Sequence, residues 1–135
     1  MVYLTKRVRF SASHRLHNPE LGDEENRRIY GPCNNPNGHG HNYLLEVTVA
    51  GQPDPRTGMI LNLDDLAKVM DERIVNDVDH KHLNHDVAWL AGVIPTVENL
   101  TKVFWRALAD AIPAGSLVSV KLQETENSWA TYRGE

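Results

Sequence analysis

Two long segments of the chain alternate between apolar and polar residues, and each has histidine at one end. In residues 2–12 the even positions are apolar with one exception, and continuing that phase places His14 on the apolar side. In the segment 41–50 the apolar phase extends back toward the N-terminus through His41 and His39. Alternation with a period of two is typical of strands that bury one face. The pattern therefore predicts two half-buried strands with histidines on their buried sides.

The other patterns along the chain predict further strands and two main helices. The short elements that we expect are a helix within 23–30, a returning strand at 59–62 after a hairpin connection at 51–58, and a closing hairpin of 117–124 with 128–133. Asn62 is expected to cap a helix whose buried stripe is Leu63, Leu66, Ala67, Met70 and Ile74. A second helix is expected to start at Thr96 and stop before Pro113, with a buried face of Val97, Leu100, Phe104, Leu108 and Ala111. This order predicts an α+β fold with two helices packed on one face of an antiparallel sheet.

Length, charge and cysteine content narrow the class of protein. The 135 residues are typical of a single domain spanning 1–135. The formal net charge of −4 argues against a nucleic-acid surface, which needs clustered Lys and Arg. No apolar run is long enough to cross a bilayer and no signal-peptide pattern is present, so we expect no membrane association. Because Cys33 is the single cysteine, no internal disulfide can form, which favours a cytoplasmic protein.

The histidines at the strand ends have the residue type and the direction of a metal site. His39 and His41 are two residues apart, so their side chains point to the same face of a strand. Zinc is bound by three or four groups such as imidazole, and His14 can supply the third. One histidine on an apolar face is more often a turn or core residue, but three on the inward phase favour a metal ion.

Cys33 lies in the segment CNNPNGHGHNY (33–43), and three interpretations of it stay open. It can be a small buried apolar residue, which is the commonest role of a free cysteine. It can be a fourth, structural zinc ligand, or a reactive thiolate stabilised by nearby positive charge. Its setting among Gly, Pro and Asn weakens the first interpretation, and spacing does not separate the other two.

Asp79 directly precedes His80 in the segment VDHKHLNHD. A carboxylate beside an imidazole can orient the ring and raise its basicity, as a proton relay requires. A solvated loop in which Asp79 is a turn or cap residue explains the same residues at least as well.

Glu124 is unusual because it shares a phase with Val120 and Leu122 in the last long strand. The alternation therefore predicts a carboxylate on the inner face of the sheet. Burying a carboxylate is costly without hydrogen-bond donors, so a donor-rich ligand is one explanation, and a strand end that meets solvent is the other.

Taken together, these segments resemble the 6-pyruvoyl-tetrahydropterin synthase family. The resemblance covers nearly the whole chain and rests on FSASHRL (10–16), CNNPNGHGHNY (33–43), TGMILNLDDL (57–66), DHKHLN (79–84), TVEN (96–99) and the terminal YRGE. It implies the tunnelling fold, in which sheets from several subunits close into a barrel. It also implies a homohexamer, arranged as a dimer of trimers, with active sites between subunits.

The resemblance further implies three sets of site residues. The ligands of a Zn²⁺ cofactor would be His14, His39 and His41. The catalytic residues that handle protons, with the cysteine supplied by a neighbouring chain, would be Cys33, Asp79 and His80. The pterin would be anchored by Glu124, with two further substrate-binding residues nearby, Thr96 and Glu98.

The implied reaction converts 7,8-dihydroneopterin triphosphate to 6-pyruvoyl-tetrahydropterin with loss of triphosphate, a step of tetrahydrobiopterin biosynthesis. The basic candidates for holding the triphosphate are Arg15, Arg27, Arg28 and Lys81. Val97 and the segment 79–84 depart from the animal pattern, which affects detail of the pterin pocket.

Other functions remain open at this point. The related 6-carboxytetrahydropterin synthases of queuosine biosynthesis share the metal and the triad, but their cysteine usually lies closer to H-G-H. The five-residue spacer between Cys33 and His39 resembles the tetrahydrobiopterin type. A non-catalytic structural Cys-His₃ zinc module would use Cys33 to close the metal site. A zinc hydrolase would leave an inward-facing Glu124 without a purpose.

Overall fold

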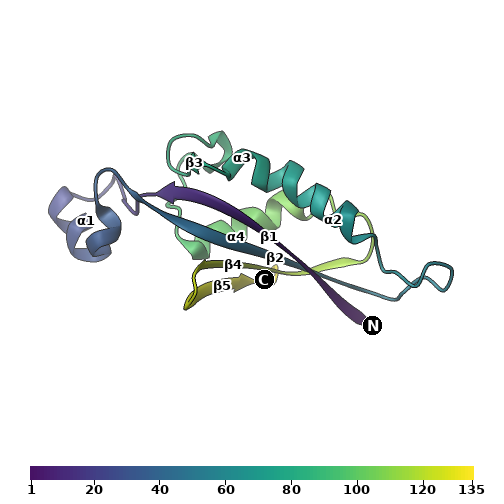
Figure 1. The fold of residues 1–135 in the computed structure, drawn as a ribbon. Coiled ribbons are helices and arrows are strands. Elements are labelled where there is room, and N and C mark those ends of the chain that lie inside the picture. The colour runs from purple at the N-terminus through teal and green to yellow at the C-terminus, as the bar shows by residue number, and fades with distance from the viewer.

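A computed structural model describes residues 1–135 as a five-stranded sheet with helices on one face (Figure 1). The strands are β1 (Val2–His14), β2 (His39–Gly51), β3 (Lys81–His82), β4 (Ser116–Thr125) and β5 (Ser128–Tyr132). Their order is β3-β1-β2-β4-β5, and all pairs are antiparallel except the short parallel pair of β1 with β3. The helices are α1 (Asp23–Tyr30), α2 (Leu63–Met70), α3 (Asn76–Val78) and α4 (Val97–Leu108). The predicted α+β class is confirmed.

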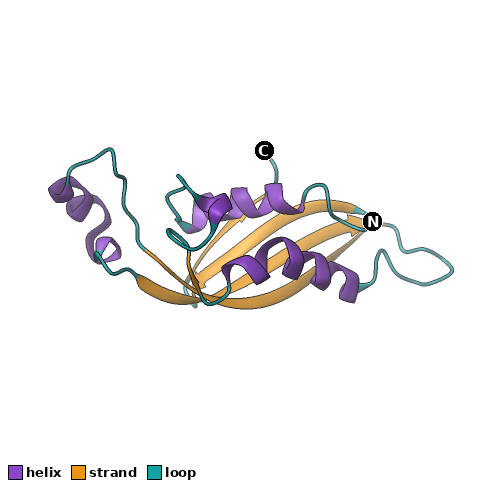
Figure 2. Cartoon of the chain, turned by 90° about the horizontal axis from the view of Figure 1, so that it is seen from above, coloured by secondary structure: helices purple, strands orange, loops and turns teal.

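Two helical segments cover one face of the sheet, as predicted (Figure 2). One is continuous from α2 through a π-helical turn at Asp71–Val75 into α3, and the other is α4. Asn62 caps α2, because its side chain accepts a hydrogen bond from the Asp64 N–H at 2.8 Å. Thr96 caps α4 by accepting from the Asn99 N–H at 3.1 Å. None of the helices combines the length and the apolar character that a membrane-spanning helix requires.

The core lies between these helices and the inner face of the sheet. Phe10 and Tyr43 stack there with ring centroids 4.8 Å apart, and Phe104 of α4 meets the Phe10 ring edge-on at 6.1 Å. The inward positions of β2 and β4 are fully buried: Tyr43, Leu45, Val47, Val49, Val120 and Leu122. The alternation in the sequence therefore predicted the correct face for both strands.

The pairing of β1 with β2 fixes where the histidines meet. In this register Ala12 is opposite His41 and His14 is opposite His39, so both strands bring their histidines to the same end of the sheet. β1 reaches His14 and β2 starts at His39, two residues before the predicted start.

The expected strand at 59–62 is wrong, and so is the hairpin connection at 51–58. β2 already pairs with β1 on one edge and with β4 on the other, so it has no free edge for a returning strand. The chain instead goes from a turn directly into α2, with Leu61 buried in the core.

The two helix predictions need smaller corrections. Leu63 is 39% exposed and does not belong to the buried stripe, because it lies at the first position of α2, beyond the edge of the core. α4 ends at Leu108, before the predicted limit, and Ala111 lies in the turn that follows.

The segment between β1 and β2 forms an arm that extends beyond the end of the sheet, and α1 lies at its tip (Figure 1). The predicted helix within 23–30 is confirmed as α1. Its only buried residue, Asn26, is 0% exposed and ties the arm together. The Asn26 amide nitrogen donates to the carbonyls of Asn18, Leu21 and Gly22 at 2.9–3.2 Å, and its oxygen accepts from the Asn18 N–H at 2.8 Å.

Asn26→Asp is expected to loosen the arm without unfolding the sheet. The substitution keeps the shape but replaces a donor by a carboxylate oxygen that faces three carbonyls, which costs about 1–3 kcal/mol for a buried unsatisfied group. Limited proteolysis should then cut the variant faster within 16–38. Asn37→Asp, at an exposed arm position, is the matched control. Equal cleavage of both variants would contradict the role of Asn26.

Candidate functional site

Three histidines converge where β1 ends and β2 begins. The candidate ligand nitrogens of His14, His39 and His41 all lie within 4.8 Å of one another. The Nε2 atoms of His14 and His39 are 3.2 Å apart. In a tetrahedral zinc site with Zn–N bonds of about 2.0–2.1 Å, neighbouring ligand nitrogens lie about 3.3 Å apart. The three side chains can therefore hold a metal ion, as the sequence predicted.

His14 is held in the orientation and the charge state that a ligand needs. Its Nδ1–H donates to the Pro95 carbonyl at 2.8 Å, which leaves Nε2 facing His39 with its lone pair. Burial lowers the pKa of His14 to about 4, and the neighbouring histidines lower it further, against the opposing effect of the Pro95 carbonyl. The imidazole is therefore neutral at pH 7, the form that binds a metal.

His41 shows that this cluster is incomplete without a ligand. Its Nε2 is buried and has no hydrogen-bond partner, and the same is true of His39 Nδ1. Burial lowers the pKa of His41 and Glu124 raises it, so this ring too is held toward its neutral form. An unpaired buried nitrogen is costly, and a metal ion between the rings satisfies His41 Nε2. The residues present thus fit a bound metal.

Glu124 reaches the same place from β4, on the inner face where the alternation predicted it. Its two carboxylate oxygens lie 3.9 Å from His14 Nε2 and 3.9 Å from His41 Nε2, too long for hydrogen bonds. The side chain is 22% exposed and its carboxylate has no hydrogen-bond donor in the chain. A partly buried carboxylate without donors is a group that a ligand can satisfy.

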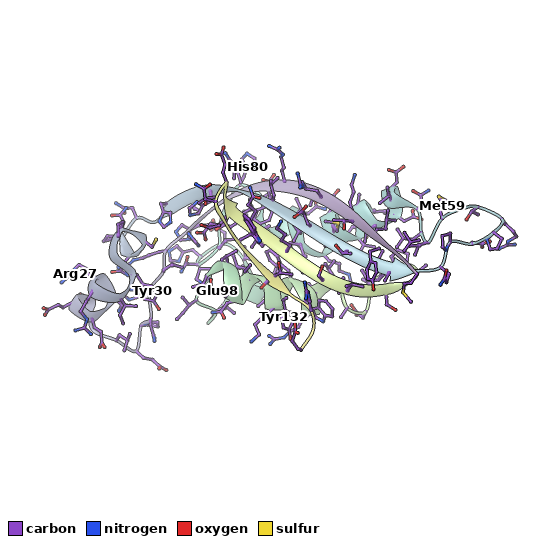
Figure 3. The ribbon with its side chains drawn as sticks, turned by 90° about the horizontal axis from the view of Figure 1, so that it is seen from below. Arg27, Tyr30, Met59, His80, Glu98 and Tyr132 are labelled. Carbon is purple, nitrogen blue, oxygen red and sulfur yellow. The ribbon has the colours of Figure 1, made fainter.

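Asp79 and His80 form a pair at the edge of the sheet. Asp79 accepts from His80 Nδ1 at 2.9 Å and from the Ser11 N–H at 2.9 Å, and these donors lower the pKa of Asp79, with the Ser11 bond the larger cause. His80 has a φ of 61°, a backbone strain that non-glycine residues adopt mainly at functional sites. Its side chain is 82% exposed and projects from the edge (Figure 3).

An open hollow of about 490 Å³ connects this pair with the histidine cluster, because His80 and His41 both line it. The hollow is almost entirely polar, and its other lining residues come from the ends of β1 and β2 and from the segment around β3: Ser11, Ala12, Ser13, Gly40, Asn42, Lys81, His82 and Asp86.

Cys33 lies in the 3-10 turn Gly31–Asn34 at the base of the arm and is half-buried. Its carbonyl accepts from the Leu16 N–H at 2.9 Å, which ties the turn to the residues that follow His14. The thiol is not part of the histidine cluster, so one chain does not form a Cys-His₃ site.

Thr96 and Glu98 lie at the start of α4. Thr96 follows Pro95, the residue whose carbonyl holds His14, so it is half-buried beside the cluster. Glu98 is exposed on the first turn of α4 (Figure 3).

Two groups at the site were not predicted from the sequence. The Pro95 carbonyl is a backbone acceptor, which no side-chain pattern reveals. The Tyr43 hydroxyl lies 3.4 Å from His14 Nδ1, and its place on the inward phase two residues after His41 was a usable signal.

The fold and the site together define a metal-binding α+β protein whose three-histidine cluster leaves room for a further ligand. A family model described as 6-pyruvoyl tetrahydropterin synthase matches residues 3–135. The chain therefore belongs to the 6-pyruvoyl tetrahydropterin synthase family, a family of lyases.

Individual relatives agree with this placement. A human protein described as 6-pyruvoyl tetrahydrobiopterin synthase is 50% identical over 132 residues, covering 98% of this chain and 91% of the human protein. The structure of Caenorhabditis elegans 6-pyruvoyl tetrahydropterin synthase superposes with a TM-score of 0.93 at 37% identity, covering 99% of this chain and 96% of that one. An Archaeoglobus fulgidus protein provisionally described as a 6-carboxy-5,6,7,8-tetrahydropterin synthase is 32% identical over 95 residues, covering 70% of this chain and 75% of that protein.

Proposed function

We propose that this chain is a zinc-dependent lyase that converts 7,8-dihydroneopterin triphosphate to 6-pyruvoyl-tetrahydropterin with loss of triphosphate. The observation that carries the proposal is the cluster of His14, His39 and His41, with Glu124 3.9 Å from two of its rings and without a hydrogen-bond donor. A metal site and a free carboxylate on one inner face suit a substrate with both oxygen ligands and N–H donors. Membership of the family and 50% identity to the human relative support this substrate.

The metal would be held by His14, His39 and His41. Three protein ligands are typical of catalytic zinc, which supplies Lewis-acid polarisation of a substrate oxygen and acidifies the neighbouring C–H. The chain's own part is to keep the imidazoles neutral by burial and to fix His14 through the Pro95 carbonyl.

Proton transfer would fall to Cys33 and to the Asp79–His80 pair. A thiolate at Cys33 would take the proton from the substrate carbon, and His80 would return a proton to the product. The Asp79 carboxylate, 2.9 Å from His80 Nδ1, orients the ring and stabilises its protonated form. As the electron pair of the broken C–H bond shifts along the side chain, the C–O bond to triphosphate breaks and triphosphate departs.

A second copy of the chain would be needed to complete this site. Cys33 lies on an arm that projects beyond the sheet, and His80 is 82% exposed at the sheet edge, so each can meet a neighbouring subunit (Figure 1). The sheet also has free strand edges, at β5 and along most of β1, since β3 pairs only with Ala12 and Ser13. We propose a homohexamer, as a dimer of trimers, in which these edges pair and the sheets close into a barrel.

The oligomer makes a direct prediction. Light scattering at micromolar concentration is expected to give a mass of six chains, because open edges pair between copies. A monomer would contradict both the barrel and the shared active site.

Glu124 would anchor the pterin, with Thr96 and Glu98 nearby at the start of α4. A pterin ring offers two parallel N–H donors, which one carboxylate accepts together. The carboxylate has no hydrogen-bond donor within the chain, so those donors would satisfy it.

Glu124→Gln is expected to weaken substrate binding by about 2–5 kcal/mol, because an amide donor then faces the N–H groups of the ring. The melting temperature and the metal content should barely change. Titration calorimetry with the substrate and metal analysis measure the two effects. Loss of metal from this variant would instead make Glu124 a fourth ligand, and unchanged binding would leave it without a role.

Mass analysis of the product tests the whole proposal. Purified protein incubated with zinc and dihydroneopterin triphosphate should release 6-pyruvoyl-tetrahydropterin and triphosphate. A carboxyl in place of the pyruvoyl side chain would identify a 6-carboxytetrahydropterin synthase of queuosine biosynthesis, the second candidate, which the Archaeoglobus fulgidus relative favours. Absence of any turnover would leave a non-catalytic zinc module. We place the protein, as one domain of residues 1–135, in the cytoplasm, where its single cysteine stays reduced.

A further inference from the structure

A small hollow beside the turn that carries Cys33 contains two arginines and no acidic residue. Its volume is about 150 Å³, and its lining is Arg15, Arg27, Gly31, Pro32, Asn34, Asn35 and Pro36. Four other arginines of the chain form salt bridges with carboxylates, whereas Arg15 and Arg27 form none. Two unpaired guanidinium groups at one polar hollow favour an anion as its ligand.

Arg15 is held in place by hydrogen bonds that leave its terminal nitrogens free. The Asn84 side chain accepts from the Arg15 N–H at 2.8 Å and donates to the Arg15 carbonyl at 2.9 Å. The Arg15 Nε–H donates to the Asn34 carbonyl at 3.0 Å. The guanidinium is therefore positioned before any ligand arrives, and both of its terminal nitrogens can donate to one.

Arg27 is tied to the same turn from the other side. Its carbonyl accepts from the Gly31 N–H, where a φ of 56° lets the chain leave α1 and enter the turn of Cys33. Arg27, the hollow and Cys33 are thus parts of one short segment, and the Leu16–Cys33 hydrogen bond joins that segment to Arg15. Wherever Cys33 acts, these two arginines lie beside it.

We infer that Arg15 and Arg27 bind a phosphate group of the substrate, an inference that rests on the proposed triphosphate chemistry. The volume equals the share of about five water molecules in the liquid, which suits a phosphate group better than a pterin ring. The other two basic candidates fit less well. Arg28 pairs with Glu25 at 3.4 Å, and Lys81 lines a hollow that also contains the Asp86 carboxylate.

Binding of inorganic tripolyphosphate to the zinc-loaded protein tests the inference without turnover. Arg27→Gln should weaken this binding by about 10- to 100-fold, the loss typical of a charge-assisted contact. The KM for the triphosphate substrate should rise by a similar factor. Arg28→Gln is the matched control, because it removes the same charge from the neighbouring residue of the same helix. Its affinity for tripolyphosphate should equal that of the unmodified protein.

The outcomes separate this inference from the proposed reaction. Equal affinity of Arg27→Gln and Arg28→Gln for tripolyphosphate, or no binding by the unmodified protein, would overturn the phosphate site even if the protein turns over its substrate. Selective loss in Arg27→Gln would support the site even if dihydroneopterin triphosphate proves not to be the substrate.

Discussion

Cys33→Ala is expected to lower turnover by about 10²–10⁴-fold while the metal content and substrate affinity stay unchanged, since this is the usual loss for a missing general base. The physical reason is the position of the thiol. Cys33 lies on the arm, outside the group of His14, His39 and His41, so its removal takes no ligand from the metal. Metal analysis, substrate titration and single-turnover kinetics on the same preparation measure the three quantities.

The alternative roles of Cys33 give different results in the same experiment. If the thiol of a neighbouring chain closed the metal site, Cys33→Ala would lose the metal together with activity, because a ligand is missing. If Cys33 were only a packing residue, both metal and turnover would survive. Cys33→Ser is the matched control for packing, because it keeps the size of the side chain while replacing the thiol by a hydroxyl that is a far weaker base at neutral pH.

The sequence predicted the faces of the strands well, because burial of one face imposes a period of two that the residues must follow. That period alone placed His14, His39, His41 and Glu124 on the inner face. It did not specify that His14 lies opposite His39, since register depends on pairing between segments far apart in the chain.

The errors have a common physical origin in tertiary structure. Residues 59–62 have strand-like apolar residues, but both edges of β2 were already occupied by β1 and β4. The Pro95 carbonyl, which fixes His14, belongs to the backbone and is independent of residue type. Asn26 is a buried hydrogen-bonding residue in a polar, irregular segment, where no periodicity distinguishes it from its exposed neighbours.

The arm also limits what one chain can reveal about catalysis. Cys33 and His80 lie at opposite margins of the histidine cluster, one on the arm and one at the sheet edge. Sequence similarity brings them into one active site, whereas the single chain holds them apart. The shared hollow between His41 and His80 is the part of that site that one chain forms alone.

His41→Ala is expected to abolish metal binding and, with it, activity. The unmodified protein should hold about one zinc ion per chain, and loss of one of three ligands should weaken binding by well over the 10–100-fold typical of a lost outer-shell partner. His41 is chosen because its buried Nε2 has no other partner, so the substitution removes an unsatisfied atom and not a structural bond.

The fold should survive His41→Ala, because β1 and β2 pair through backbone hydrogen bonds on both sides of this position. Circular dichroism should therefore match that of the unmodified protein, while metal analysis after dialysis shows the loss. His85→Ala is the matched control: its ring stacks on His82 at 4.3 Å and lies outside the cluster, so the metal should remain. Full retention of zinc by His41→Ala would remove His41 from the site, and equal loss in both variants would point to nonspecific binding by exposed histidines.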